Sequence, residues 1–327
     1  MANTLTVTSV VDHTSDAGFR TWGAEFHASL VSIGLTLTSD TGQINWTTVT
    51  RSAASNTTAG YEIWRFNDSL QSTTPIFLKI EFGTGATANQ PLIWITIGNG
   101  SNGSGTLTGL TSARIATSNA GSTSYGVTVT STVTTYTSRF VYNPTLGFFG
   151  FAWKIGAALT DACSAAAFVF RSNDTTGAAT STSVSLLAGK SDTGTTTMYN
   201  GLLQTLNYTT GLLYPSAGAF AQMGWYSTHP FALTATLVGS TVDIDPVFYL
   251  SPSINVAVGL GRALKSEVAM GTAVSATLVG STAHTYVQIG CPHYSTQTVT
   301  LAGSYVGADA YNQGLSGATL GLMMLWE

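Results

Sequence analysis

Charged side chains are scarce in this sequence, and that scarcity limits its fold more than any other feature. Asp, Glu, Lys and Arg together make up 8% of the 327 residues, where globular chains carry about 25%. Coiled coils and long helices depend on Glu, Lys and Arg, and disordered chains combine high charge with few apolar residues. Because 44% of the residues are apolar, the chain can bury a large core. The composition excludes a disordered chain and a coiled coil.

The same composition excludes several partners. With 11 basic and 15 acidic residues, the net charge is −4, and no basic stripe is present to bind a nucleic acid backbone. The two cysteines form no C-x-x-C pair and no disulfide framework. The opening residues 1–10 lack the pattern of a signal peptide, and the longest apolar stretch, 146–159, is too short to span a bilayer. We expect synthesis and assembly in a cytoplasm, without membrane insertion.

The scarcity of charge also bears on self-association. A surface made largely of Thr, Ser, Asn and Gly has little like-charge repulsion to keep copies apart. We therefore expect a homo-oligomer.

One amphipathic helix is predicted near the N-terminus. Ser15 and Asp16 are natural N-cap residues, and Gly34 stands where a left-handed residue would end the helix. Apolar side chains recur between them at spacings of three and four, which predicts one buried face. They are Phe19, Trp22, Phe26, Leu30 and Ile33. Arg20, Glu25 and Ser29 are expected on the opposite face.

Most of the remaining chain has the pattern of strands and turns. The segment 75–82 alternates, which predicts Ile76, Leu78, Ile80 and Phe82 on one face. The segment 92–97 is apolar on both faces, as expected of a central strand. Further strands are predicted at 61–66, 148–153, 165–170 and 320–326, with turns or hairpin loops at 83–89 and 172–177. The predicted fold is mainly β with one N-terminal helix (α+β), with antiparallel sheets in a β-sandwich-like arrangement.

A change in composition suggests two parts. Residues 99–138 are almost wholly Gly, Ser, Thr, Asn and small apolar residues, with Val-Thr runs such as 127–133 that favour loops and exposed strands. We place a division near residue 110: a helix packed on an antiparallel sheet at 1–110 and a β-rich part at 111–327, with one continuous domain as the alternative. The sequence ATLVGST occurs at 235–241 and 276–282, through either a duplicated hairpin or coincidence.

Few residues have the pattern of a catalytic or metal site. Cys291 and His293 lie close together, but a zinc site needs about four ligands. Asp243 and Asp245 would share one face of a strand about 7 Å apart, a separation that suits a cation or an inverting glycosidase. Without a third acid nearby, we interpret them as a solvated strand end. We predict no catalytic residue, no metal site and no cofactor.

Three other titratable residues have structural interpretations. His27 lies beside the apolar stripe of the predicted helix, as a partly buried residue. Glu62 and Glu81 lie in predicted strands with Arg65 and Lys79 nearby, so we expect cross-strand ion pairs for both.

Tyrosines in polar loops are the candidate contact residues. Their rings would stack on the C–H faces of a sugar or contact another protein, and the sequence does not separate these roles. They are Tyr199, Tyr208, Tyr214, Tyr226, Tyr294 and Tyr311.

Several motifs resemble the virion structural proteins of tailed bacteriophages. The motifs are FRTWG at 19–23, IGL at 33–35, DTGQINW at 40–46, GYEIWRFNDSLQ at 60–71 and PIFLKIEFG at 75–83. Weaker similarity occurs at 148–153, 168–178 and 322–327. The resemblance is strongest over residues 15–105 and becomes scattered after residue 180. It implies a place in the virus particle rather than an activity, and it supplies no catalytic residues.

Together, these features predict a non-enzymatic phage virion subunit, peripheral to the particle in the tail, baseplate, neck or fibre-attachment region. Its partners would be copies of itself and other virion proteins. One alternative is a capsid decoration protein. A second is a receptor-binding module of a fibre that holds host-surface glycan through the loop tyrosines, and a third is a depolymerase that uses Asp243 and Asp245.

Overall fold

The computed structural model describes one helix and twenty strands. It covers residues 3–12, 14–85, 91–117, 134–155, 163–173, 179–188, 202–214, 221–222, 233–237, 244–250, 257–266, 273–278, 284–290 and 321–325. All strand pairs in these ranges are antiparallel. The protein is therefore mainly β with an N-terminal helix, as predicted.

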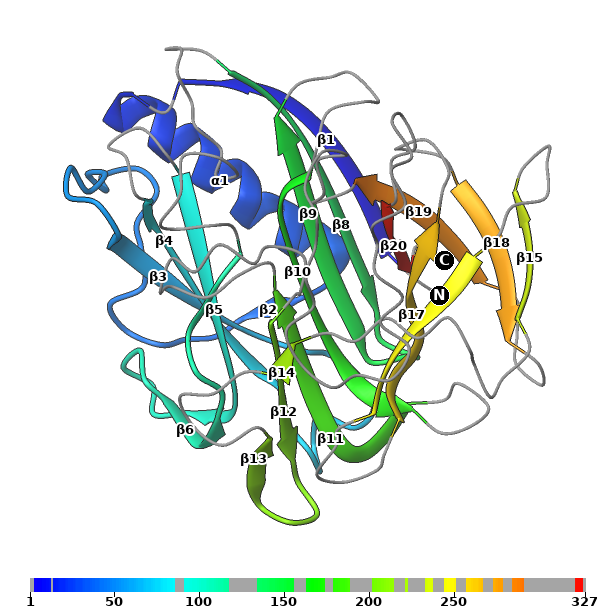
Figure 1. Cartoon of the computed structure of the whole chain (residues 1–327). Coiled ribbons are helices and arrows are strands. Elements are labelled where there is room, and N and C mark those ends of the chain that lie inside the picture. Colours follow the sequence, from blue (N-terminus) through cyan, green and yellow to red (C-terminus); the bar gives the residue numbers. More distant parts are fainter. Residues whose placement is uncertain are drawn as a thin grey trace.

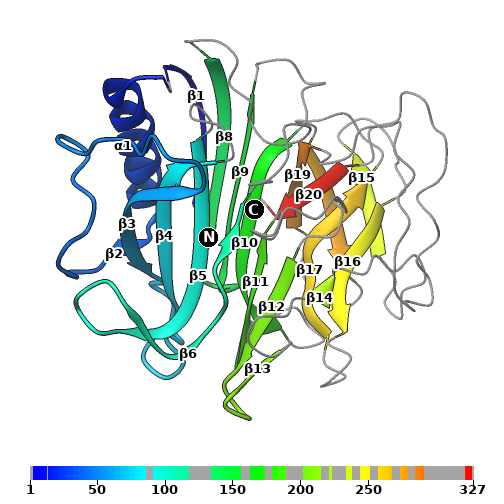
Figure 2. The ribbon, with the colours of Figure 1, turned by 60° about the vertical axis from the view of Figure 1, so that its left-hand side comes forward.

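The strands form three sheets, named here A, B and C. Sheet A has the order β1-β8-β9-β10-β11-β12-β13, and β14 also pairs with β12. Its strands are β1 (Asn3–Val11), β8 (Thr134–Asn143), β9 (Phe148–Ile155), β10 (Cys163–Asn173), β11 (Ala179–Ala188), β12 (Leu202–Asn207), β13 (Leu212–Tyr214) and β14 (Ala221–Gln222). Sheet A lies between the other two sheets in both ribbon views (Figure 1 and Figure 2).

Sheet B lies on the helix side of sheet A. Its order is β2-β3-β4-β5-β6, and β7 also pairs with β5. Its strands are β2 (Thr36–Leu37), β3 (Thr57–Arg65), β4 (Phe77–Thr84), β5 (Pro91–Ser101), β6 (Leu107–Thr111) and β7 (Ile115–Ala116).

Sheet C lies on the other side of sheet A. Its order is β15-β18-β19-β20-β17-β16, and it approaches sheet A where β17 lies against β10. Its strands are β15 (Leu233–Leu237), β16 (Ile244–Leu250), β17 (Ala257–Ser266), β18 (Ala273–Leu278), β19 (His284–Gly290) and β20 (Gly321–Leu325). The predicted terminal strand is β20.

The helix α1 (Asp16–Ile33) begins and ends where the sequence predicts. Ser15 is the N-cap, and its hydroxyl accepts a hydrogen bond from the Gly18 N–H at 3.1 Å. Gly34 adopts a left-handed conformation with φ 98° and its N–H bonds back to the helix carbonyls, a conformation that glycine adopts without steric cost. All five predicted apolar positions are buried, but Ser29, expected on the polar face, is also buried. Its hydroxyl donates to the Glu25 carbonyl at 2.8 Å.

The strands of sheet B confirm the alternation seen in the sequence. The predicted face of β4 and the residue before it is fully buried at Ile76, Leu78, Ile80 and Phe82. In β5, both faces are buried, with Ile93, Ile95 and Ile97 in the main core and Leu92 and Trp94 in a second cluster with Ala116. The expected loop at 83–89 overlaps residues 86–90, and the run 127–133 and most of the turn at 172–177 also lie outside the described residues.

One core joins α1, sheet A and sheet B. Phe26 of α1 lies at its centre, and its ring packs edge-on against Phe82 of sheet B at 5.5 Å and against Phe140 and Phe151 of sheet A, both at 5.1 Å. The predicted division near residue 110 falls within β6, β1 pairs with β8, and this core contains residues from both sides of the division. The division itself stays a prediction.

The two copies of ATLVGST begin in neighbouring strands of sheet C. β15 pairs with β18 so that Ala235, the first residue of one copy, lies opposite Ala276, the first residue of the other. The next residues of the two copies diverge, because Thr236 lies opposite Ser275 and Thr277 lies opposite Thr234. Within the described ranges, no helix is long and apolar enough to cross a bilayer.

Candidate functional site

A buried carboxylate lies between α1 and sheet B. Glu62 of β3 is 2% exposed, and its Oε1 accepts hydrogen bonds from His27 Nδ1 at 2.7 Å and Trp46 Nε1 at 2.8 Å. Its Oε2 accepts from Trp64 Nε1 at 3.0 Å. The His27 ring also lies 5.2 Å from the Trp64 ring. Three donors from three segments therefore converge on one carboxylate, which fixes the helix to the sheet.

This arrangement corrects the expected ion pairs. Glu62 is opposite Ile80 in the register and pairs with His27, not with Arg65 or Lys79. Glu81 instead pairs with Arg114, whose Nε lies 2.9 Å from Glu81 Oε2.

The two cations near these strands, Arg114 and Lys79, each lie over an aromatic ring. The Arg114 guanidinium stacks over the Trp94 ring at 4.1 Å, and Lys79 Nζ lies 4.6 Å from the centre of the Tyr61 ring. Aromatic faces attract cations. The sequence spacing alone did not reveal these partners because Arg114 reaches the sheet through the later strand β7.

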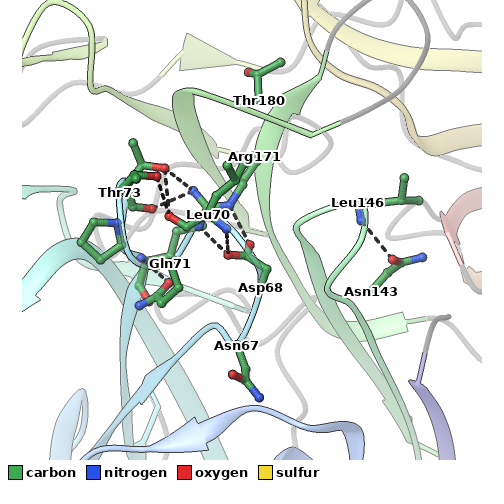
Figure 3. A network of polar contacts seen from close by, with 12 residues as sticks. Asn67, Asp68, Leu70, Gln71, Thr73, Asn143, Leu146, Arg171 and Thr180 are labelled. Carbon is green, nitrogen blue, oxygen red and sulfur yellow. Dashed lines mark hydrogen bonds and ion pairs between the residues drawn. The ribbon is translucent and has the colours of Figure 1, made fainter.

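A second buried charge joins sheet A to sheet B. Arg171 of β10 is 0% exposed and Asp68, in the loop between β3 and β4, is 2% exposed. Arg171 Nε donates to Asp68 Oδ2 at 2.7 Å, and Arg171 Nη2 donates to Asp68 Oδ1 at 2.8 Å. Arg171 Nη1 donates to the Thr74 carbonyl at 2.8 Å and to the Thr74 hydroxyl at 3.0 Å. We call the contacts among Arg171, Asp68 and Thr74 the clasp. Figure 3 shows Arg171 and Asp68 pointing toward each other.

The backbone around the clasp is shaped to receive Arg171. Gly147 has φ 57°, and a Cβ at that position would lie 2.7 Å from Arg171 Cδ. The Arg171 N–H donates to the Gly147 carbonyl at 2.8 Å. Glycine is therefore required at this turn both for its positive φ and for the close approach of the arginine stem.

Two tyrosines close the clasp on its sheet A side. The Tyr142 hydroxyl accepts a hydrogen bond from the Asn67 N–H at 2.6 Å, and the Tyr208 hydroxyl donates to the Pro75 carbonyl at 2.7 Å. Burial raises the pKa of both phenols above the ordinary value, so both stay neutral around pH 7. The loop from Asn67 to Pro75 is thus held by β8, by β10 and by the turn after β12.

A third polar cluster fixes the loop that follows β2. The Asp40 carboxylate accepts hydrogen bonds from the Thr38 hydroxyl at 2.6 Å, from the Gly105 N–H at 3.1 Å and from the Ser101 hydroxyl. Burial opposes ionisation of Asp40, but these hydrogen bonds together outweigh it and hold the pKa of the carboxyl below its ordinary value. The DTGQ segment is therefore a structural anchor for the loop after β5.

The structure describes two of the six candidate tyrosines. Tyr208 is half-buried against the core and its hydroxyl is used inside the fold. Tyr214 ends β13, opposite Thr205 in the register. The four others lie outside the described residues: Tyr199, Tyr226, Tyr294 and Tyr311. A contact role for these tyrosines stays a prediction.

Among the weaker chemical candidates, Asp245 is described by the structure. Asp245 is in β16, where it is opposite Lys265 of β17, so opposite charges occupy facing positions on the two strands. Asp243, Cys291 and His293 lie outside the described residues. In the described ranges, no three His, Cys, Asp or Glu side chains gather as a metal site would require.

Two of the residues that organise these clusters were not singled out by sequence reasoning. Arg171 directly follows the apolar segment 165–170. Because a charged residue is rarely buried without a partner, this position at the end of a buried strand could have indicated a buried ion pair. Asp68 carried no such signal, because it lies in a polar loop far away in the sequence.

The comparisons with known proteins give no relative for this chain. No protein-family model matches it, and no curated protein or solved structure matches it either. In the clusters above, charged and polar groups are bonded to one another across the helix and the sheets.

Proposed function

We propose that this protein is a non-enzymatic structural subunit of a tailed-bacteriophage particle, peripheral to the capsid in the tail, baseplate, neck or fibre-attachment region. The motifs that resemble phage virion proteins support this proposal, because the strongest of them, at 15–105, coincide with α1 and most of sheet B. These motifs include part of α1, its C-terminal cap Gly34 and most of β3 and β4, and they also contribute Asp40, Glu62 and Asp68.

The observation that carries the proposal is how the buried charges are used. Asp68 binds Arg171, Glu62 binds His27 and two indoles, and Asp40 binds two hydroxyls and a backbone N–H. Each carboxylate joins segments that are distant in the sequence. Groups that serve as general acids or bases must instead reach a substrate proton. The chemistry of these clusters favours rigid scaffolding, which suits a subunit that must keep its shape in a particle.

The proposal is tested by quantitative mass spectrometry of gradient-purified particles from a phage that encodes this chain. We expect roughly a few copies per hundred copies of the major capsid protein, as for a ring or trimer at a few positions on the particle. Several copies per ten capsid proteins would make the protein a decoration subunit instead. Its absence from washed particles would refute a structural role in the virion.

A second measurement tests the non-enzymatic part of the proposal. Purified protein is incubated with surface polysaccharides of the host, and the release of reducing ends is followed against a buffer control. We expect no release. Release that disappears in Asp243→Asn would refute the proposal and support a depolymerase.

A further inference from the structure

The outer face of α1 carries an uninterrupted uncharged stripe. Its exposed residues follow one another at spacings of four, three, four and three, which are the spacings of the contact positions in a coiled coil. They are Ala17, Thr21, Ala24, Ala28 and Val31. Small side chains at these positions would let a second helix approach closely. We call this set the α1 stripe.

Exposed apolar side chains also occur on the strands that contact α1. Three of the four large hydrophobic residues exposed in the described ranges are Val10 at 63%, Val31 at 53% and Leu37 at 37%. Val31 is on α1, and the other two are on β1 and β2, which contact α1 and form the end strands of sheets A and B. In both ribbon views, α1 lies at the periphery of the molecule (Figure 1 and Figure 2). The large apolar residues exposed in the described ranges are therefore concentrated on α1 and the two edge strands that contact it.

The charges beside the α1 stripe select the partner and its direction. Arg20 directly precedes Thr21, and Glu25 directly follows Ala24, so the two charges flank the stripe on opposite sides. When two such helices pack in parallel, this arginine position of one helix faces this glutamate position of the other. In an antiparallel pair, each flank would instead face its own kind. The complementarity therefore favours a second, parallel copy of α1.

Both charged groups can take part in such a contact. Arg20 uses Nε on the Val49 carbonyl at 2.6 Å and Nη2 on the Thr48 carbonyl at 3.4 Å, and a guanidinium has five N–H donors. Within the described residues, the Glu25 carboxylate has no hydrogen bond or ion pair.

We propose that copies of this chain associate through the α1 stripe, with their α1 helices packed in parallel about a rotation axis along the helix. Arg20 of one copy pairs with Glu25 of the next, and Val31 is buried at the contact. The inference concerns self-association alone and does not depend on a place in the virion.

The first experiment measures the mass of the full-length protein by sedimentation equilibrium over a range of concentrations. We expect a reversible oligomer for the natural sequence and at least about a tenfold weaker association for Ala24→Glu, which would bring like charges together in the contact. The matched control is Ala53→Glu, at an exposed position outside α1. A monomer at every concentration, or an Ala24→Glu variant with unchanged association, would overturn the proposal. Far-UV circular dichroism checks that both variants are folded.

The second experiment tests the direction of the helices. Glu25→Arg should weaken association because it places like charges across the contact, and adding Arg20→Glu should restore it. Ala24→Cys should form a disulfide with the same residue of a second copy under mild oxidation, with the unsubstituted chain as the control for Cys163 and Cys291. Preferential linkage of Ala17→Cys to Ala28→Cys in a mixture of the two variants would overturn the parallel arrangement.

Discussion

Replacing Asp68 by alanine would leave the Arg171 guanidinium buried without its counter-charge. Arg171 is 0% exposed and Asp68 is 2% exposed, and two hydrogen bonds of 2.7 and 2.8 Å join them. Removing one partner of such a pair costs about 3–5 kcal/mol, because the remaining charge cannot regain its hydration. The Thr74 carbonyl offers Arg171 a polar partner but no negative charge. We therefore expect Asp68→Ala to lose about 3–5 kcal/mol of unfolding free energy.

The assay is urea unfolding followed by tryptophan fluorescence and, independently, by far-UV circular dichroism, so that a change in cooperativity would be detected. Ser69→Ala, at the exposed neighbouring position, is the matched control and should change stability by less than about 0.5 kcal/mol. The double variant Asp68→Leu/Arg171→Met removes both charges, and we expect it to recover most of the loss, since apolar replacements of buried ion pairs are often neutral.

The stabilities of Asp68→Ala and of the double variant together test the role of the ion pair. A loss below about 1 kcal/mol in Asp68→Ala would mean that Arg171 rehydrates easily and that the clasp does not hold the sheets. A double variant less stable than Asp68→Ala would mean that the stem of Arg171 and its bonds to Thr74, not the ion pair, stabilise this region.

Three further results are expected. Asp40 has a lowered pKa in the folded protein, so the stability that its carboxylate contributes is present above the ordinary Asp pKa and is lost as the pH falls through the lowered value. Asp40→Asn should therefore flatten the fall in unfolding free energy between about pH 5 and pH 2, measured by urea titrations. An unchanged slope would contradict this contribution of Asp40. Glu62→Gln places an amide among three donors and should cost about 1–3 kcal/mol, with a changed near-UV spectrum of the tryptophans; an unchanged spectrum and stability would contradict the cluster. Phe26→Ala, at the junction of three elements, should cost about 3–5 kcal/mol by calorimetry, and a loss like that of a surface residue would contradict its place in the core.

The sequence predicts α1 and the three longest strands of sheet B, β3, β4 and β5, because they depend on short-range periodicity. The spacing of Phe19, Trp22 and Phe26 requires a helical face, and the alternation from Ile76 to Phe82 requires a strand. The caps Ser15 and Gly34 act within one turn of the helix. In each case, the residues that determine the structure are neighbours in the sequence, so the pattern is visible without the fold.

The partners of buried charges could not be predicted in the same way. Glu62 was expected to find a cation on an adjacent strand, but α1 supplies His27 instead. Arg171 and Asp68 are 103 residues apart and meet only when sheets A and B pack together. The strand β1 was not predicted either, because its pairing with β8 depends on a distant segment.

The place of β1 at the end of sheet A has a consequence for how the protein is made. Val11 pairs with Thr134 and Asn3 with Tyr142, so β1 leaves the ribosome before β8, and its partner in sheet A is missing until β8 follows. At about 5–20 residues per second, that interval is on the order of 10 s. During this time α1 and sheet B can form, while the Thr- and Val-rich β1 remains unpaired. On a polysome, neighbouring nascent chains carry the same uncharged, unpaired β1. Premature β-pairing between chains is therefore most favoured in the interval before β8 emerges.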